Sequence, residues 1–393
     1  MTTPRFSVLI PTRDRPDTFC HTLATVVSQP GDDYEIVVAD NCSGPETRRI
    51  VEGLSLPNVR YLRSDEILPM TANWERGLSA CTGEYVTILG DDDGLVASAL
   101  AMARKLIAAT EAEIISWTPH TYWWPDTIVT WLRNVLIVLP GNGADWLESR
   151  SALLGFYRGE IGFDRIPMIY QAFFHRALIE DARQRFDAFF APPDTAPDLS
   201  SGILGLHLTE RFVHSTRALS IRGNSGKSNG TAQWARSLGA RQREVYFREE
   251  RIGLEGIIHK SLVPSPNLQI VVASALLKCK ETYFPDDEAL TLDLQGLLGG
   301  MLAQLASDPD AYEDNLRDIR ALAAKLGMAL KAEEIPAKVP VDRKRVWGPV
   351  IDPEGALARM RINGELAGVS DIAGAARLVE ALMPPAESYL TVS

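Results

Sequence analysis

The sequence has few cysteines, and none of them form a metal-binding or redox pair. Cys20, Cys42, Cys81 and Cys279 are the only four among 393 residues, and no Cys-x-x-Cys pattern occurs. This spacing excludes a zinc finger and a disulfide-stapled scaffold. Three of the four lie in or beside apolar segments, which favours small core residues. Reduced thiols of this kind predict a cytoplasmic location.

Long hydrophobic runs are also absent. No uninterrupted apolar run approaches the roughly 20 residues that a membrane helix needs. The nearest one, TWLRNVLIVLP, contains Arg133 and Asn134. The N-terminal stretch MTTPRFSVLIPTRDRP lacks the long apolar core of a signal peptide. The sequence therefore predicts a soluble protein without a transmembrane segment.

The chain has no excess of positive charge. Its 40 Lys and Arg residues are outnumbered by 51 Asp and Glu residues, which gives a net charge of −11. Nucleic-acid binding depends largely on basic side chains that contact phosphates, so we expect no nucleic-acid partner. An anionic ligand must instead be held locally, by a few basic side chains, backbone N–H groups or a metal ion.

The two common glycine-rich phosphate loops are missing as well. A dinucleotide-binding fold would place Gly-x-Gly-x-x-Gly after the first strand. Here the strand-like FSVLIP leads into TRDRPDTF, which contains no glycine. The P-loop pattern GxxxxGK[ST] does not occur either. A phosphate-containing ligand therefore needs another anchor, and a bound metal ion is the natural substitute.

What the first 118 residues do contain is an alternation of strand-like and helix-like segments. Because such alternation is typical of a parallel sheet with helices on its faces, we predict an α/β fold with a mostly parallel, Rossmann-like sheet. Ligands of such sheets bind beyond the carboxyl ends of the strands. The polar stretches TRDR, DNCSG and GDDDG follow the first, second and fourth strands and should meet there. The expected strands are Phe6–Pro11, Tyr34–Asp40, Val59–Ser64, Tyr85–Gly90 and Glu113–Thr118, and the expected helices are Asp17–Ser28, Pro45–Leu54, Thr71–Ala80 and Ser98–Ala109.

The pattern changes twice further along the chain. Residues 121–230 are mixed, with strand-like TIVTWL and VLIVLP, helix-like ADWLESRSALLGFY, and the loop-like FFAPPDTAPDLSSG and RGNSGKSNGT. After Thr231 the residue pattern is mainly helical, with QGLLGGMLAQLASD as one clear helix. The segment IPAKVPVDRKRVWGPVIDP reads as a linker to a small last region with a helix near Ile372–Met383.

Three consecutive aspartates follow the apolar strand YVTILG. Adjacent carboxylates repel one another, which raises their pKa values. One explanation for Asp91, Asp92 and Asp93 is a solvated acidic turn. The other is a hard divalent cation, because Mg²⁺ and Mn²⁺ take carboxylate oxygens as ligands. We favour Mn²⁺ or Mg²⁺ as a cofactor that bridges two phosphates.

Four stretches together resemble the family-2 inverting glycosyltransferases of the A-type nucleotide-sugar fold. They are FSVLIPTRDRPDTFCHTLATVVSQ, YEIVVADNCSGPET, TANWERGLSACTGEYVTILGDDDGLVASAL and APDLSSGI, and they extend over about the first 230 residues. The resemblance implies a catalytic domain at 1–230, with a nucleotide-binding half at 1–118 and an acceptor half with a lid at 119–230. A helical region at 231–335, and a linker with a small C-terminal region at 336–393, match no family that we can name.

The resemblance also implies residues for the nucleotide. Pro11, Thr12 and Arg13 would line the base and pyrophosphate pocket, and Asp40 would accept a hydrogen bond from the imide N–H of uracil or thymine. Asn73 and Arg76 resemble family positions that face the nucleotide. Simpler roles remain open at this point: Thr12 and Asp14 could cap a helix, Asp40 could form a strand-end turn, and Arg76 could form an exposed salt bridge.

The aspartate triplet departs from the family signature, which is acid-x-acid-acid followed by three residues and proline. Aligned through DGLVASAL, Gly90 stands at the first acidic position, and Asp92 is the acid nearest the metal. Asp91 would then lie beside the ribose hydroxyls, and Asp93 would either support the metal ligands from behind or serve as an alternative ligand. A literal Asp-x-Asp interpretation makes Asp91 and Asp93 the metal-binding pair, and the sequence leaves both registers open.

An inverting sugar transfer needs a base for the acceptor hydroxyl. The resemblance assigns that role to Asp198 in APDLSSGILGLHL, with Asp194 as the alternative and a helix N-cap as the simpler role. IRGNSGKSNG resembles a lid over the diphosphate, with Lys227 as its cation, although a flexible linker is also compatible. His175 and His214 have no paired nucleophile and are interpreted as structural.

We therefore predict a metal-dependent inverting glycosyltransferase. It would move a sugar from a UDP- or dTDP-sugar to the hydroxyl of a sugar or other acceptor by single displacement. The alternatives are a sugar-phosphate nucleotidyltransferase and a non-catalytic nucleotide-binding scaffold. The Leu- and Ala-rich C-terminal helices have more apolar surface than a tail should expose, so we expect them to pack on the catalytic domain or to form a homodimer.

Overall fold

The structure is a computed structural model that describes residues 4–190, 196–305, 308–340, 343, 345–385 and 388. Its centre is an eight-stranded sheet in the order β3-β2-β1-β4-β10-β6-β11-β9. Strands β1 to β4, β6 and β11 run in one direction, and β10 and β9 run in the other. The sheet is therefore mostly parallel, as predicted. Its strands are β1 (Phe6–Thr12), β2 (Tyr34–Asp40), β3 (Val59–Arg63), β4 (Tyr85–Ile88), β6 (Ile114–Trp117), β9 (Ala144–Glu148), β10 (Ala172–His175) and β11 (Arg211–Ser215).

Helices cover both faces of this sheet, which explains why its central strands are apolar at almost every position. In β1, Phe6, Val8 and Ile10 face one core, which α1, α2 and α4 complete. Leu9 faces the opposite core, which α3, α5, α6 and α7 complete. These helices are α1 (Pro16–Val27), α2 (Pro45–Leu54), α3 (Met70–Leu78), α4 (Ala99–Thr110), α5 (Ser149–Tyr157), α6 (Arg176–Phe186) and α7 (Pro197–Leu208).

A second sheet adjoins the carboxyl end of the first sheet near the aspartate triplet. It has six strands in the order β13-β14-β8-β7-β12-β5. Its short strand β5 begins directly after Asp93, so the triplet lies in the connection between the two sheets. The strands are β5 (Gly94–Leu95), β7 (His120–Trp123), β8 (Val135–Val138), β12 (Ser220–Asn224), β13 (Gly348–Ile351) and β14 (Leu357–Asn363).

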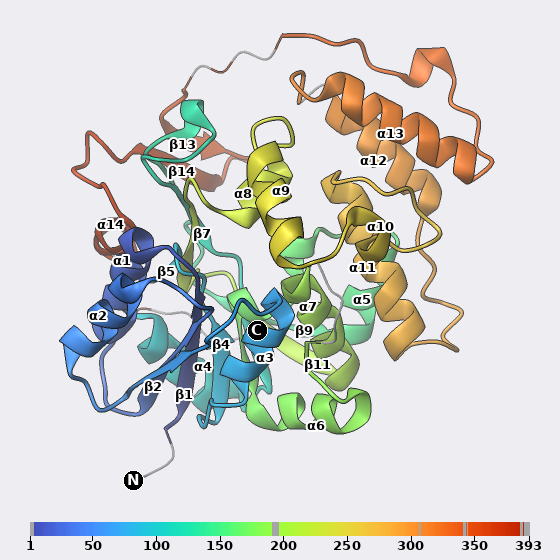
Figure 1. The fold of residues 1–393 in the computed structure, drawn as a ribbon. Helices are drawn as coiled ribbons and strands as arrows, with labels where there is room; N and C mark the ends of the chain where they lie inside the picture. Colours follow the sequence, from blue (N-terminus) through green and yellow to red (C-terminus); the bar gives the residue numbers. More distant parts are fainter. Residues whose placement is uncertain are drawn as a thin grey trace.

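The region after residue 230 is mainly helical, as predicted. Figure 1 shows its orange helices grouped beside the central part of the molecule. They surround a third apolar core, and α11 also packs on α7, so that Leu276 and Cys279 belong to the same core as Leu9. The helices are α8 (Asn229–Trp234), α9 (Ala240–Glu249), α10 (Leu254–Ile257), α11 (Leu268–Tyr283), α12 (Leu294–Leu305) and α13 (Tyr312–Lys325). A homodimer through these helices stays a prediction.

The last part of the chain returns to the N-terminal half. Strand β14 pairs with β8, and helix α14 (Ile372–Leu382) packs against α1, as Figure 1 shows for the dark red helix beside the blue one. Val369, Ile372 and Val379 are buried in the same core as Phe6. The helix near residue 372 is thus confirmed, and the segment expected to be a linker contains β13. The domain boundaries at 230 and 335 stay predictions.

Three local expectations were wrong. In TIVTWL, only Thr130–Leu132 has regular structure, as a short 3₁₀ helix, and it is not a strand. Ala144–Glu148 forms strand β9 instead of the start of a helix, because it pairs with β11 in the sheet. The loop-like RGNSGKSNGT continues β12 as far as Asn224 and contains the first half of α8. Among the described residues, no helix combines the length and the apolar character needed to cross a membrane.

Candidate functional site

The loops after β1, β2 and β4 meet at the carboxyl edge of the sheet, as the strand pattern predicts. Asn41 N–H donates to Thr12 O at 2.9 Å, and Asp14 N–H donates to Ser43 Oγ at 2.9 Å. Asp14 and Cys42 have φ angles of 47° and 62°. Left-handed backbone is costly for residues other than glycine and is often found at functional sites. The geometry of these loops is therefore fixed by their contacts with each other.

Asp91 is bound from the loop after β1. Thr12 Oγ1 donates to Asp91 Oδ2 at 2.8 Å, and Arg15 Nη1 lies 2.9 Å from Asp91 Oδ1. Thr12 makes no cap bond to the following helix, whose N-cap is Arg15. The Thr12 hydroxyl therefore belongs to the acidic cluster. Arg15 was not among the predicted site residues. It is the last residue of the TRDR stretch after β1, and this position at the sheet edge is the signal that points to it.

Asp92 is bound from the second sheet. Its Oδ2 accepts from both the backbone N–H and the hydroxyl of Ser225, at 3.1 and 2.6 Å. The indole N–H of Trp124 donates to Asp92 O at 2.9 Å. Burial raises the pKa of Asp92, and the neighbouring charge of Asp91 raises it further against the opposing effect of Arg15. A cation beside this carboxylate would offset both the cost of burying its charge and its repulsion from Asp91.

Asp93 points back into the turn that it closes. Its two carboxylate oxygens accept from Gly223 N–H at 2.6 Å and Gly90 N–H at 3.2 Å. Burial and the charge of Asp92 raise its pKa to about 7. Gly223 must be glycine for this approach, because a Cβ there would lie 1.7 Å from Asp92 O. The three aspartates therefore have three different environments, which their adjacency in the sequence conceals.

Asp198 lies in the helix that meets strand β4 through Ile169, because Ile169 O accepts from Thr87 of β4 at 3.1 Å and Ile169 N–H donates to Ser201 of α7 at 3.1 Å. It belongs to the first turn of α7, whose N-cap is Ala196, so it is not the cap. The half-buried Tyr170 packs edge-on against Trp74 with ring centroids 5.0 Å apart. Its phenol pKa is raised by burial and then by the charges of four carboxylates, which are Asp93, Asp198, Asp91 and Asp92. No sequence motif points to Tyr170. Asp194, the alternative base, lies outside the described residues.

The residues expected to bind the nucleotide form a neighbouring cluster at the ends of β2 and β3. Asp40 is fully buried; its Oδ1 accepts from Ser43 N–H at 2.9 Å, which is the strand-end turn considered above, and its Oδ2 accepts from Tyr61 OH. Arg76 forms no ion pair among the described residues, and its Nη2 donates to Asp40 O and to Asn73 Oδ1. Its Nε is buried without a hydrogen bond in the described part of the chain.

Arg13 and Lys227 have different surroundings, although both were expected near the diphosphate. The Arg13 guanidinium pairs with Glu249 of α9 at 2.5 Å, so this part of the helical region covers the loop after β1. Lys227 Nζ donates to Asp14 O at 2.8 Å, and Lys227 O accepts from Arg15. Lys227 therefore joins the cluster around Asp91, whereas Arg13 is drawn towards α9. Pro11 lies within β1, one residue before Thr12.

The donor set around the triplet fits a metal ion that a ligand helps to hold. No group of three or more acidic, histidine or cysteine side chains able to enclose a metal occurs among the described residues. Mg²⁺ is commonly bound by one or two carboxylates together with substrate phosphates, so a complete protein cage is not required. Asp92 Oδ1 has no hydrogen bond within the described chain, while both oxygens of Asp91 and Asp93 have partners.

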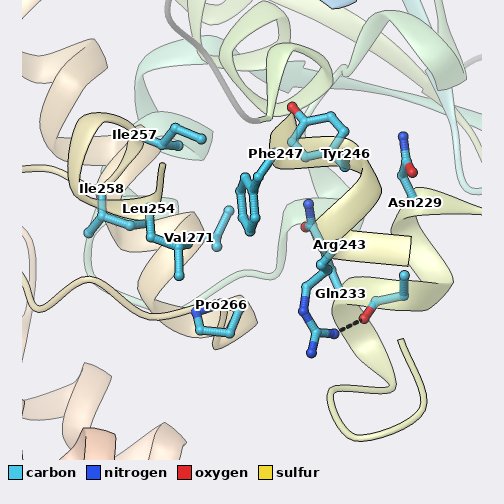
Figure 2. Close-up of a pocket in the computed structure, with 11 residues that line it drawn as sticks. Asn229, Gln233, Arg243, Tyr246, Phe247, Leu254, Ile257, Ile258, Pro266 and Val271 are labelled. Atoms are coloured by element: carbon cyan, nitrogen blue, oxygen red, sulfur yellow. Dashed lines mark hydrogen bonds between the residues drawn. The ribbon is translucent and has the colours of Figure 1, made fainter. Parts of the chain in front are cut away.

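Two cavities lie apart from this acidic cluster. Figure 2 shows the first, where Phe247 and Tyr246 of α9 face Leu254, Ile257 and other apolar residues. Its volume of about 20 Å³ has room for roughly one water molecule, so it cannot hold a sugar nucleotide. The second is an open groove of about 660 Å³ lined by residues from the far end of α7, including His207, and by residues 283–287. Neither is lined by residues of the triplet.

Comparison with known proteins identifies the N-terminal part of the chain. Residues 7–168 match the model of the family described as "Glycosyl transferase family 2". A β-1,3-glucosyltransferase of Campylobacter jejuni that acts on GalNAc(5)-diNAcBac-PP-undecaprenol is 32% identical over 101 residues, which is 25% of this chain. WcaA of Escherichia coli K12, named as a colanic acid biosynthesis glycosyl transferase, is 26% identical over 113 residues, which is 28% of this chain. The matches span 33% and 40% of these relatives' lengths.

Two solved structures are also similar. TarS of S. aureus in complex with UDP-GlcNAc aligns with 83% of this chain and 93% of its own, at a TM-score of 0.46 and 15% identity. The mannosyltransferase PcManGT of Pyrobaculum calidifontis, in complex with GDP-Man and Mn²⁺, aligns with 82% of this chain and 81% of its own, at a TM-score of 0.41 and 18% identity. The family match over residues 7–168 and the two curated relatives show that this chain contains a glycosyltransferase domain of family 2.

Proposed function

We propose that the protein is a metal-dependent inverting glycosyltransferase that moves a sugar from a UDP- or dTDP-sugar to an acceptor hydroxyl by single displacement. The observation that carries this proposal is that β4 and α7 meet at the short 3₁₀ helix Ile169–Gln171, where Ile169 O accepts from Thr87 of β4 and Ile169 N–H donates to Ser201 of α7. Asp91, Asp92 and Asp93 come from the end of β4, and Asp198 comes from α7. A transfer of this kind needs carboxylates in two roles. One holds the metal ion beside the leaving diphosphate, and the other removes the proton of the acceptor hydroxyl.

Asp92 is the residue that we assign to the metal ion, Mn²⁺ or Mg²⁺. Its Oδ1 makes no hydrogen bond among the described residues, and its buried charge lacks a paired cation of its own. Asp91 is bound by Thr12 and Arg15, and the carboxylate of Asp93 accepts hydrogen bonds from two backbone N–H groups. When bound, the metal would act as a Lewis acid that offsets charge on the departing nucleoside diphosphate.

We assign the nucleotide base to the cluster of Asp40, Asn73 and Arg76. A carboxylate has about four lone-pair sites, and Asp40 uses one on each oxygen, so it keeps the capacity to accept from an imide N–H. Because Asp40 is fully buried, the side chains that cover it would have to move for the base to bind. The buried Nε of Arg76 is a donor in need of an acceptor, and a carbonyl or ribose oxygen would supply one. Arg15 is the N-cap of α1, and Lys227, from the segment after β12, contacts Asp14 O beside it. Both would face the phosphates, where the helix N-terminus also favours negative charge.

Asp198 is the proposed base that removes the proton of the acceptor hydroxyl. The freed oxygen would attack the anomeric carbon from the side opposite the diphosphate, which turns an α-configured donor into a β-linked product. The name of the Campylobacter jejuni relative, a β-1,3-glucosyltransferase, also describes a β-linked product and supports this stereochemistry. Tyr170 would supply a hydroxyl that stays protonated, because burial and then the charges of the nearby carboxylates raise its pKa.

Metal-dependent nucleotide binding tests the proposal. UDP or dTDP should raise the melting temperature of the protein strongly with Mn²⁺ or Mg²⁺ and weakly with EDTA, because a ligand at 100 times its Kd stabilises by about 2.7 kcal/mol. Asp92→Ala should abolish the difference. Equal stabilisation with and without metal would contradict the proposal.

Two assays separate the rival functions. Release of pyrophosphate from a nucleoside triphosphate and a sugar phosphate would identify a nucleotidyltransferase. Binding of UDP without hydrolysis or transfer from any UDP-sugar would identify a non-catalytic scaffold. The proposed enzyme should instead release UDP or dTDP from one sugar nucleotide.

A further inference from the structure

The end of strand β12 makes direct contact with all three aspartates or their partners. Gly223 N–H donates to Asp93 Oδ1, Ser225 donates twice to Asp92 Oδ2, and Lys227 O accepts from Arg15, which pairs with Asp91. About 130 residues separate this segment from the triplet in the chain. The segment 223–227 is therefore part of the wall of the acidic cluster.

Within this wall, Ser225 makes the most specific contact. Its hydroxyl and its backbone N–H lie 2.6 and 3.1 Å from the same carboxylate oxygen, Asp92 Oδ2. Ser225 and Asp92 are both buried, with 1% and 6% of their surface exposed. Two donors on one oxygen restrict rotation about the last side-chain torsion of Asp92. The other oxygen, Oδ1, is thereby held in one direction without a hydrogen bond of its own among the described residues.

Metal sites depend on such contacts. A carboxylate that binds a metal through one oxygen is commonly held through the other by a hydrogen-bond donor, and loss of that donor typically weakens metal binding by about 10- to 100-fold. A free carboxylate must also lose rotational freedom when it takes up the metal. A carboxylate that is already fixed loses less, which favours binding.

We infer that Ser225 is a positioning residue that orients Asp92 Oδ1 for the divalent cation of the donor complex. This inference rests on the proposed function, because it requires that Asp92 binds the metal. Ser225 would not itself bind the metal or the reacting atoms. It acts through Asp92, and it gives the segment 223–227 a role in metal binding beyond that of a cover over the diphosphate.

The test compares two serines of the same segment. Ser225→Ala removes the hydroxyl bond to Asp92. Ser228→Ala is the matched control, because the Ser228 side chain caps α8 by accepting from Thr231 N–H and makes no contact with Asp92. Isothermal titration with Mn²⁺ at saturating UDP gives the metal Kd, and thermal melting in EDTA gives the stability of each metal-free variant. Ser225→Cys, which keeps the volume with only a weak donor, provides a second variant if the alanine variant does not fold.

We expect Ser225→Ala and Ser225→Cys to weaken Mn²⁺ binding about 10-fold or more, while Ser228→Ala stays within twofold of the wild type. In EDTA, the melting temperatures of the Ser225 and Ser228 variants should fall by similar amounts. A loss of metal affinity confined to the Ser225 variants then cannot be attributed to a general loss of stability. A wild-type Mn²⁺ Kd in the Ser225 variants, together with loss of binding in Asp92→Ala, would overturn the role of Ser225 and leave the proposed function intact. Unchanged binding in Asp92→Ala would overturn both.

Discussion

Single residues at this site are defined by partners that are remote in the chain. The three neighbouring aspartates illustrate this, because Asp91 is bound by the loop after β1, Asp92 by Ser225, and Asp93 by two backbone N–H groups. Three adjacent, identical side chains thus have different hydrogen-bond partners. Of the two registers that the sequence left open, the one that assigns the metal to Asp92 agrees better with these contacts, because Asp92 retains an oxygen without a partner in the described chain.

Asp198 is the residue whose substitution tests the chemistry. Asparagine keeps the size of the side chain, and Asp198 is not the N-cap of α7, so folding should change little. Loss of a general base should lower kcat by about 10²-fold or more, because base assistance is typically worth ~10²–10⁴-fold. The affinity for UDP and metal should stay the same, since the proposed role of Asp198 is towards the acceptor and not towards the donor or the metal. Steady-state kinetics with the accepted donor measures the effect.

Asp194→Asn is the companion variant for this experiment. Near-normal turnover in Asp198→Asn with loss in Asp194→Asn would move the base to Asp194. If both variants turn over normally, a different group must remove the proton, and the proposed mechanism lacks its acceptor half.

At the scale of secondary-structure elements, α14 supports the site from outside the family-matched region. Its Ile372 is fully buried, and its Cγ1 lies so close to Gly94 of β5 that a Cβ on Gly94 would come within 2.8 Å of it. Strand β5 follows Asp93 directly, so this contact links the last helix to the acidic turn. The helix itself begins with a cap bond from Gly374 N–H to Asp371 at 2.7 Å.

Ile372→Ala should therefore destabilise the whole protein. Truncation of a fully buried isoleucine leaves a cavity and typically costs about 2–5 kcal/mol of unfolding free energy. Arg377→Ala on the exposed face of the same helix is the control and should stay within about 0.5 kcal/mol. Urea denaturation monitored by circular dichroism measures both. Equal stabilities of the two variants would mean that α14 does not contribute to the folded core in solution.

At the scale of the whole molecule, buried histidines make stability depend on pH. His120 in β7 has no exposed surface, and its Nδ1 accepts from Leu139 N–H at 3.0 Å. Burial, followed by the charge of Arg217, lowers the pKa of His120 from 6.5 to about 4. In the unfolded chain this histidine takes up a proton below pH 6.5, whereas in the folded protein it does so only near pH 4. Stability is therefore lost as the pH falls from 6.5 towards 4.

His120→Asn should flatten this dependence. The asparagine oxygen can still accept from Leu139 N–H, but the side chain no longer titrates. The difference in unfolding free energy between pH 7 and pH 4 should shrink by up to about 3 kcal/mol relative to the wild type, since each pKa unit corresponds to about 1.4 kcal/mol. Denaturant titrations at several pH values measure it. A pH profile identical to that of the wild type would assign the acid sensitivity to other groups.

The sequence alone determined the local features of this protein. Apolar runs of four to seven residues with polar ends located strands β1 to β4 and β6 to within about two residues, because the period of the pattern and the turn residues act over short distances. The same pattern placed an acidic triplet at the carboxyl end of a buried strand, where α/β sheets bind ligands. Where the pattern was ambiguous, as in Ala144–Glu148, pairing with β11 overrode it.

Only the tertiary structure decided which residues surround that triplet. Ser225 meets Asp92 across about 130 residues, Tyr170 lies among acids from two segments, and Arg13 turns to Glu249 instead of the acidic cluster. Strand β14 joins β8 from the far end of the chain. No local rule predicts such partners, because they depend on how the strands and helices pack as a whole. The physical reason is that a side chain binds the donor or acceptor that packing brings within about 3 Å, and sequence distance does not enter that choice.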